Sequence, residues 1–455
     1  MVLWRKWICS RTEMANNPIA DIFRIRDLRN RVLFTLGILV IHRIGSIIPI
    51  PGIDVGKLSE YFAGSSTDGR GIVDYLDFFS GGAFSNFSLF MLGVMPYITT
   101  SIIMQVSMLV FPALKRIAEE DGGRKKIQRY TRYATVLVCL LQGMALLPLP
   151  LKYEVVVAGI DNWQFMIIGM LTTTAGTIFL MWLGEQINVK GVGNGISLLI
   201  FTGIVARMPN AFMVMIREIR AQNLNPVFVI LTIVMFVMVV IFVIYEQQGL
   251  RKIPVNYAGR IVGRKQYRAQ GSYIPFKINP SGVIPVIFAS SILTLPIQLF
   301  TRLDSENSEF WGRVMTALNP TGFIYLSLYT LLIIFFAYFY TQVSLNPVEI
   351  SKQIRENGGS IPGIRSENME SYLTRILNRI VLPGSLFLAI IALIPSLLII
   401  AIPGFPQQMA YIMGGTSLLI MVGVDLDTMS QIEGHLKMHH HDGLTKGGRL
   451  RSRNL

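Results

Sequence analysis

Ten stretches of apolar residues, each about as long as a helix that crosses a lipid bilayer, recur along the chain and restrict its fold more than any other feature. A helix needs about 20 such residues to span the hydrocarbon core. The pattern therefore predicts an all-α polytopic membrane protein with ten transmembrane helices. The ten stretches are residues 32–50, 87–110, 134–150, 163–183, 195–216, 226–245, 282–300, 321–345, 380–402 and 407–424.

The composition agrees with a membrane protein and excludes an ordinary soluble enzyme. Only 15% of the residues are charged, whereas soluble domains have about 25%. Hydrophobic residues make up 52% of the chain, and its mean hydropathy is +0.50. The two cysteines, Cys9 and Cys139, lie too far apart in the sequence to suggest a disulfide framework or a cysteine-based zinc site.

The basic residues predict how the chain is oriented in the membrane. If all ten stretches span the bilayer, the connecting segments alternate between its two sides, and one set carries 32 of the 41 Lys and Arg residues. Loops rich in Lys and Arg stay on the cytoplasmic side. We therefore expect two cytoplasmic termini, with residues 1–31 as an N-terminal segment and residues 425–455 as a basic, histidine-containing tail.

Glycine and proline interrupt the second and the seventh apolar stretch in a similar way, at Gly81–Pro96 and at Asn279–Pro285. These two stretches are five spans apart. Interrupted spans at matching places indicate an internal repeat with the working site between the halves, and an odd number of spans per half makes the repeat inverted. The sequence thus predicts two inverted five-helix halves, residues 32–216 and residues 226–424.

No motif for catalysis, for a cofactor or for a metal is present. The chain has no Walker-type phosphate loop, no HExxH and no GxSxG in a strand-to-helix turn. Four histidines cluster in the tail, but the glycines around them offer little scaffold for metal ligation. We expect no enzyme activity, no cofactor and no metal site. The four are His435, His439, His440 and His441.

Several short strings, in the same order and at similar spacing, resemble the bacterial SecY family, whose members are the channel subunits of the protein-export translocon. The resemblance extends from about residue 20 to residue 430. Residues 1–13 fall outside it, and we expect translation to begin at Met14, an interfacial anchor being the alternative. The strings include FSGGA at 79–83, GVMPYI at 93–98, GNGIS at 193–197, GVIP at 282–285 and GGTSLLI at 414–420.

The resemblance implies an hourglass of ten helices with an apolar pore ring and a re-entrant plug helix at residues 72–84. An apolar collar excludes water and ions by dewetting, and it offers a translocating polypeptide no fixed polar partner. By matching motif to motif, the pore ring comprises Val94, Ile98, Ile196, Ile200, Ile287 and Ile420. The plug residues are Ile72, Leu76, Phe79, Gly81 and Gly82.

The resemblance also implies a lateral gate, in which Gln105 and Asn279 match polar positions at the seam between the two halves. Polar contacts between helices in lipid contribute only about 0.6 to 2 kcal/mol. A signal sequence of about ten apolar residues gains roughly 3 to 6 kcal/mol on reaching lipid, which is enough to shift such a gate.

Further implications concern the partners and the location. The family's cytoplasmic loops bind the ribosome or the SecA motor ATPase, and a polyanionic ribosome makes a salt-sensitive contact. Signal peptides, nascent chains, lipid, and SecE-type and SecG-type subunits are the other implied partners, and DNA is not one. The implied location is the bacterial cytoplasmic (inner) membrane. The matching basic residues are Arg251, Lys252, Arg264, Lys265 and Arg365.

Two classes of function remain. One is a passive protein-conducting channel that external partners drive, and the other is an ion-coupled secondary transporter, which also uses inverted repeats and broken helices. A transporter needs carboxylates or histidines at mid-membrane in the second and seventh spans, and the sequence has none there. The channel is therefore the favoured prediction.

Overall fold

Each of the ten predicted stretches overlaps a helix of at least 16 residues in the computed structural model of the chain. These helices are α3 (Arg26–Gly45), α6 (Met95–Val110), α8 (Gly123–Leu146), α10 (Asn162–Lys190), α11 (Gly195–Arg220), α12 (Pro226–Gln248), α13 (Ile284–Phe300), α15 (Phe323–Ser344), α17 (Met369–Ala401) and α19 (Gly415–Gly447). The structure describes residues 25–58, 77, 80–120, 122–222, 226–257, 261–262, 265–266, 271–300, 322–402, 405, 409–411 and 414–447.

Within this described part of the chain, six helices are long and apolar enough to cross a membrane by themselves. The pair α6 and α7 (Pro112–Glu119), which bends by 105°, makes a seventh. The other three fall short for local reasons: α3 contains several arginines, α13 has 17 residues, and α19 becomes polar after residue 424. The prediction of an all-α, multi-pass membrane bundle is confirmed.

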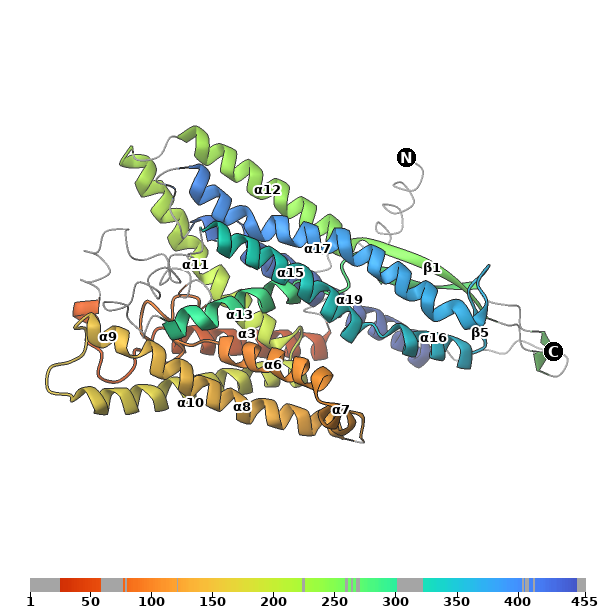
Figure 1. The fold of residues 1–455 in the computed structure, drawn as a ribbon, viewed down its shortest axis with the longest axis horizontal. Helices are drawn as coiled ribbons and strands as arrows, with labels where there is room; N and C mark the ends of the chain where they lie inside the picture. Colours follow the sequence, from red (N-terminus) through yellow and green to blue (C-terminus); the bar gives the residue numbers. More distant parts are fainter. Residues whose placement is uncertain are drawn as a thin grey trace.

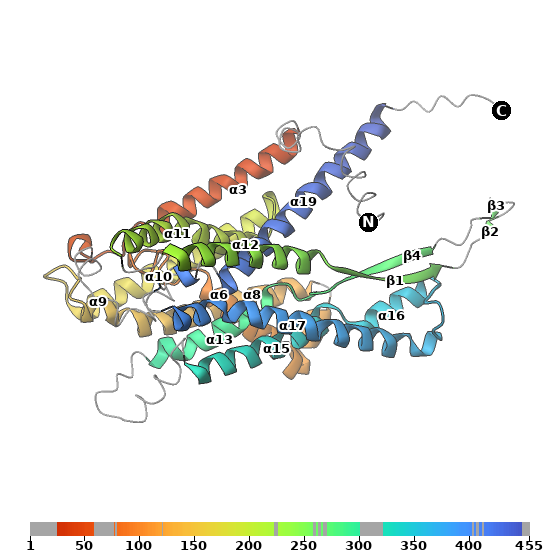
Figure 2. The same ribbon diagram turned by 90° about the horizontal axis from the view of Figure 1, so that it is seen from above.

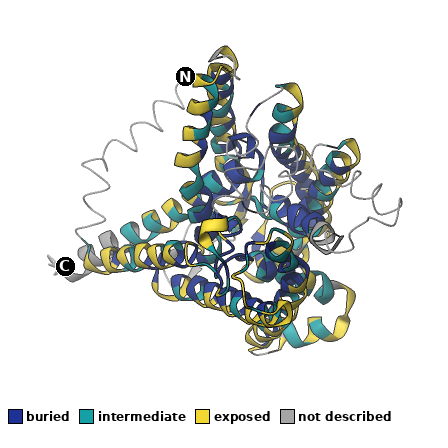
Figure 3. Ribbon diagram, turned by 90° about the vertical axis from the view of Figure 1, so that its left-hand side faces the viewer, coloured by how far each residue is buried: buried dark blue, intermediate teal, exposed yellow. Residues whose placement is uncertain are grey.

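The helices pack as two groups that meet along a few contacts (Figures 1 and 2). In the first group α8 packs against α6 and α10, and α3 packs against α10 and α11. In the second, α15 packs between α13 and α17, while α19 contacts α12 and α17. The groups touch where α13 meets α6 and α8, and where α11 meets α19. Exposed residues line the outward faces of the helices, as lipid contact requires (Figure 3).

Several boundaries differ from the predictions: α8 and α17 begin well before the predicted stretches, and two further differences have a clear local cause. The predicted stretch at 87–110 becomes helical only at Met95, because Gly93 has a φ of +57° and Pro96 suits the first turn of a helix. Turns occupy residues 81–94 instead. At the other end of the chain, the last helix continues from Gly415 to Gly447, well beyond the predicted limit at residue 424, since no proline follows to stop it.

A small sheet at one end of the bundle was not predicted. Strand β1 (Leu250–Tyr257) pairs antiparallel with β4 (Gly271–Lys277) and β5 (Gly359–Ser360), and β2 (Ile261–Val262) pairs with β3 (Lys265–Gln266). Ile253 and Val255 alternate with exposed residues on β1, so one face of the strand is buried. The sheet packs with α16 (Pro347–Glu356) and the start of α17, next to the 3₁₀ turn Ser366–Asn368.

The arrangement of the connections agrees with the predicted alternation between two sides. Figure 1 shows α7, α16, β1 and β5 at one end of the bundle, and the short helix α9 (Pro148–Lys152) at the opposite end. All four elements at the first end belong to the segments predicted to be rich in Lys and Arg. The basic residues therefore gather at one end of the molecule.

The close packing of α10 on the turns before α6 gives a testable prediction. A Cβ at Gly176 would overlap the backbone carbonyl of Leu89. We expect Gly176→Ala to cost about 1 to 3 kcal/mol, which is typical of overpacking, and to lower the Tm in detergent. Gly37→Ala is the matched control, because Gly37 also lies in a helix and has no atom near that would meet a Cβ. Equal Tm values for the two variants would contradict the prediction.

Candidate functional site

The six residues assigned to the pore ring belong to one apolar cluster in the interior of the bundle. Five of them come from four helices, two of each helix group: α6, α11, α13 and α19, and Val94 is the N-cap residue of α6. Val94, Ile98, Ile200 and Ile420 are buried, and Ile196 and Ile287 are half-buried against the same cluster. The structure thus brings together side chains that lie up to 326 positions apart in the sequence.

A tight turn of glycines sets the start of α11 and with it the position of Ile196 and Ile200. Asn188 Oδ1 accepts a hydrogen bond from the Gly195 backbone N–H at 2.8 Å, and Asn194 caps the helix. A Cβ at Gly195 would overlap the carbonyl of Gly184 on α10. Only glycine permits this approach, so α11 begins directly against α10.

Glycines also set the starts of α13 and α19, which carry Ile287 and Ile420. Gly282 and Gly415 have φ values of +59° and +67°, in the left-handed region that favours glycine. Gly415 packs against Pro395, inside α17. The interruptions that the sequence showed before these two helices therefore direct apolar side chains into the shared interior.

The structure describes only some of the residues assigned to the plug. Ile72, Leu76 and Phe79 lie outside the described residues. Gly81 and Gly82 form a turn with φ values of +66° and +95°, and a Cβ at Gly81 would overlap the Cα of Gly203 on α11. The glycine turn therefore lies directly against the helix that carries Ile196 and Ile200.

Polar groups from two helices bind this turn, and sequence reasoning did not assign them a role. Arg43 Nη1 on α3 donates to the Gly81 carbonyl at 3.0 Å. Arg207 on α11 forms an ion pair with Asp77 and donates to Ser85 Oγ at 3.0 Å. The sequence feature that could have pointed to Arg207 is its position within an otherwise apolar span, because a charged residue at such a position usually has a function.

The two residues assigned to the lateral gate do not bind one another in this conformation. Gln105 Nε2 donates to Ser101 Oγ on its own helix at 3.3 Å. Asn279 is buried, donates to the Gly282 carbonyl at 3.0 Å and accepts from Ser281 Oγ at 2.9 Å. The seam itself is present, because α13 packs against α6 and α8.

The basic residues assigned to partner binding lie at the end of the bundle that carries the sheet. Arg251 and Lys252 are exposed on β1, and Lys252 Nζ lies 4.7 Å from the centre of the Tyr273 ring. Arg365 is exposed just before the short 3₁₀ turn. Arg264 and the side chain of Lys265 lie outside the described residues, although the Lys265 backbone pairs with Val262.

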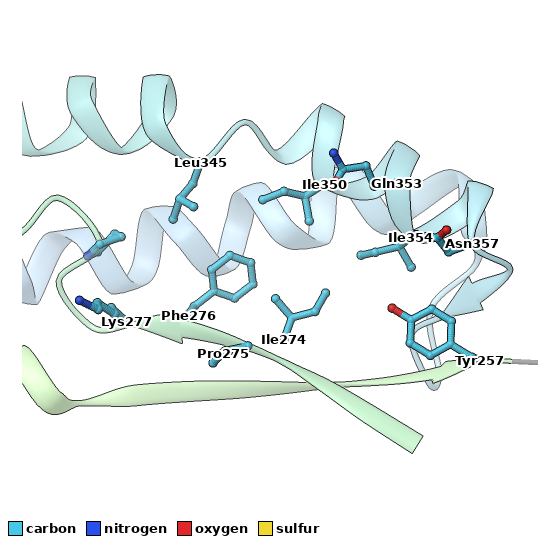
Figure 4. Close-up of a pocket in the computed structure, with 11 residues that line it drawn as sticks. Tyr257, Ile274, Pro275, Phe276, Lys277, Leu345, Ile350, Gln353, Ile354 and Asn357 are labelled. Carbon is cyan, nitrogen blue, oxygen red and sulfur yellow. The ribbon is translucent and has the colours of Figure 1, made fainter. Parts of the chain in front are cut away.

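A groove of about 440 Å³ opens at this same end, between the β1–β4 hairpin and α16 (Figure 4). Ile274 and Phe276 of β4 face Ile350 and Ile354 of α16 across it. None of the six pore residues lines this groove. It therefore lies at the end that carries the sheet and not in the interior of the bundle.

The chemistry of the spans does not support an ion-coupled transporter. Helices α6 and α13 contain no Asp, Glu, His, Lys or Arg. Glu185, at the end of the fourth predicted stretch, is paired with Arg132 of α8 through contacts of 3.0 and 2.7 Å. Among the described residues, no group of three or more His, Cys, Asp or Glu could hold a metal ion.

Comparisons with known proteins identify the family. The SecY family model matches residues 88–429. The protein translocase subunit SecY of Borreliella burgdorferi is 47% identical over 92% of this chain and 94% of that protein.

Solved structures share the fold at lower sequence identity. A structure that concerns the SecY plug domain, reported to stabilise the closed state of that translocation channel and maintain a membrane seal, has a TM-score of 0.61 and 19% identity, covering 89% of this chain and 92% of that one. Sec61 in the canine ribosome–channel complex has a TM-score of 0.60 and 20% identity with the same coverage. With a family match over most of its length and a close relative over nine-tenths of it, the chain belongs to the SecY family of protein translocase subunits.

Proposed function

We propose that the chain is the protein-conducting subunit of a membrane translocase. It passes unfolded secretory polypeptides across the bilayer and releases transmembrane segments sideways into the lipid. The observation that carries this proposal is that six apolar residues share one apolar interior, with a glycine turn that two arginines bind packed against α11. The sequence contains no nucleotide-binding or hydrolase motif, so external partners supply the energy.

The pore ring acts as a seal that a polypeptide can still pass. Valine and isoleucine side chains do not hydrogen-bond to water, so a narrow collar of them dewets and excludes ions. The same side chains form no directional bonds with a moving chain, so polypeptides of any sequence can slide through. Burial of Ile98, Ile200 and Ile420 in this conformation supports a closed state.

The lateral gate opens along the seam between the pair α6 and α8 and the pair α13 and α15. Gln105 on α6 and Asn279, which precedes α13, are each bonded within their own segment. No strong polar bond between these two has to break when the helices separate. The gain of roughly 3 to 6 kcal/mol from moving an apolar signal into lipid can therefore shift the gate toward the open state.

The end that carries the sheet faces the cytoplasm and receives the partners. The concentration of Lys and Arg in its connections supports this orientation, with both termini on the cytoplasmic side of the bacterial inner membrane. Arg251, Lys252 and Arg365 contact the ribosome or the SecA motor there. SecE-type and SecG-type subunits complete the assembly, as expected for this family.

Shortening the pore residues tests the seal. We expect Ile98→Gly and Ile200→Gly to raise the resting chloride conductance of reconstituted channels about tenfold, because each removes a side chain from the collar and admits water. The measurement is ion flux from proteoliposomes without precursor. Ile230→Gly, on the exposed face of α12, is the control and is expected to leave the conductance unchanged. A tight seal in both pore variants would refute the assignment.

Charge reversal tests the partner contact. Arg365→Glu is expected to weaken ribosome binding about tenfold at 50 mM salt and to lower the slope of log affinity against log salt by about one. Sedimentation with ribosomes at several salt concentrations measures both quantities. Lys125→Glu provides the matched control, because Lys125 is exposed near α7 at the same end of the bundle. Equal losses in the two variants would indicate a nonspecific charge effect.

A further inference from the structure

We propose that Arg207 and Arg43 latch the plug turn in its closed position. Arg207 binds Asp77 and Ser85, and Arg43 binds the Gly81 carbonyl. The plug turn is defined here as Asp77 together with residues 80–86. The proposal rests on the channel function proposed above, and it assigns roles to residues outside the pore ring, the gate and the partner-binding loops. Both arginines act as positioning residues, since neither belongs to the pore ring.

The contact with Arg207 joins two segments that are 130 positions apart in the sequence. Its guanidinium forms an ion pair with Asp77, and the side chains are 16% and 5% exposed. Arg207 Nη2 also donates to Ser85 Oγ at 3.0 Å, and Asp77 Oδ1 accepts from the Ser85 backbone N–H at 2.7 Å. Asp77 and Ser85 are thus tied to each other and, through Arg207, to α11.

The second contact comes from a different helix. Arg43, near the end of α3, donates from Nη1 to the Gly81 carbonyl at 3.0 Å. Because α3 and α11 pack against one another, the two arginines are held in a fixed relation. The plug turn is therefore bound from two directions, and it cannot leave without losing both contacts.

Glycines allow the turn to come close enough for these bonds. The approach of Gly81 to the Cα of Gly203 leaves no room for a side chain, and an added Cβ at Gly82 would lie 3.0 Å from Arg207 Nε. The backbone carbonyl of Gly81 and the guanidinium of Arg207 therefore meet their partners at hydrogen-bonding distance.

The latch is reversible because Asp77 and Arg207 are paired away from water when the plug turn is closed and are solvated by water when it is open. In the closed state the charges of Asp77 and Arg207 are largely shielded from water and compensate each other, and removing one leaves the other buried without a partner, which is strongly unfavourable. When the plug turn moves away, water enters the space it leaves and solvates both charges. A translocating chain therefore does not have to create two dry, unpaired ions in order to open the channel.

A double-mutant cycle tests the latch. Asp77→Asn and Arg207→Gln are each expected to raise the resting ion leak of reconstituted channels about tenfold, because each leaves the other residue's charge uncompensated. The double variant removes both charges together and is expected to leak no more than the leakier single variant. Independent effects that multiply in the double variant, or leaks equal to wild type in all three, would overturn the proposal.

Matched variants separate the latch from a general loss of structure. Arg217→Gln removes the same charge from an exposed position on the same helix and is expected to leave the leak unchanged. Ser85→Ala removes the hydroxyl that Arg207 contacts, which also donates to the Gly82 carbonyl at 3.2 Å, and is expected to raise the leak about twofold to fivefold. If Arg207→Gln fails to assemble, Ser85→Ala decides the question, and a leak equal to wild type in that variant would overturn the latch.

A transport assay with the wild type distinguishes failure of the latch from failure of the proposed function. Vesicles that contain the chain, the SecE-type partner and the SecA motor are given ATP and a signal-bearing precursor. Transport by the wild type, together with wild-type leak in Asp77→Asn and Arg207→Gln, would reject the latch alone. Absence of precursor transport by the wild type would reject the channel function on which the latch depends.

Discussion

Close approach of helix backbones at glycines is the constraint on which the rest of this structure depends. Lipid tails are as apolar as the side chains that face them, so burial of apolar surface does not drive helices together inside a bilayer, and association relies on tight packing at small residues. Gly176 meets the carbonyl of Leu89, Gly195 meets that of Gly184, and Gly81 meets Gly203. These three contacts fix the turns before α6, the start of α11 and the position of the plug turn.

This packing determines where the apolar interior and the plug turn lie. Helices that begin at glycine-rich breaks direct apolar side chains into one interior cluster, and the plug turn is brought within reach of two arginines. In the proposed channel, water exclusion comes from the apolar ring, and the proposed latch reinforces closure with polar bonds that water can replace. The connections predicted to be rich in Lys and Arg lie at one end of the bundle, the end at which we propose that charged partners bind.

The sequence was most informative where a long pattern repeated. Each apolar stretch overlaps a helix of at least 16 residues, but the beginning of α6 at Met95 depended on backbone angles at Gly93 that no periodicity reveals. The strands β1 and β4 were missed because they occupy a basic connection. The pairing of Arg207 with Asp77 joins residues 130 positions apart, so only the three-dimensional packing could show it. Motif resemblance supplied the pore-ring assignment, which stays a prediction; four of the six residues lie in the apolar interior cluster, and Ile196 and Ile287 pack against it.

The most direct test of the central claim asks whether a moving polypeptide touches the apolar ring. A photo-crosslinking amino acid is placed at Ile200 or Ile420, or at Leu231 on the exposed face of α12, and a precursor is arrested midway through translocation. Passage through the centre predicts crosslinks to the arrested chain from positions 200 and 420 and none from position 231. Efficient translocation without crosslinks from the two ring positions would contradict the account.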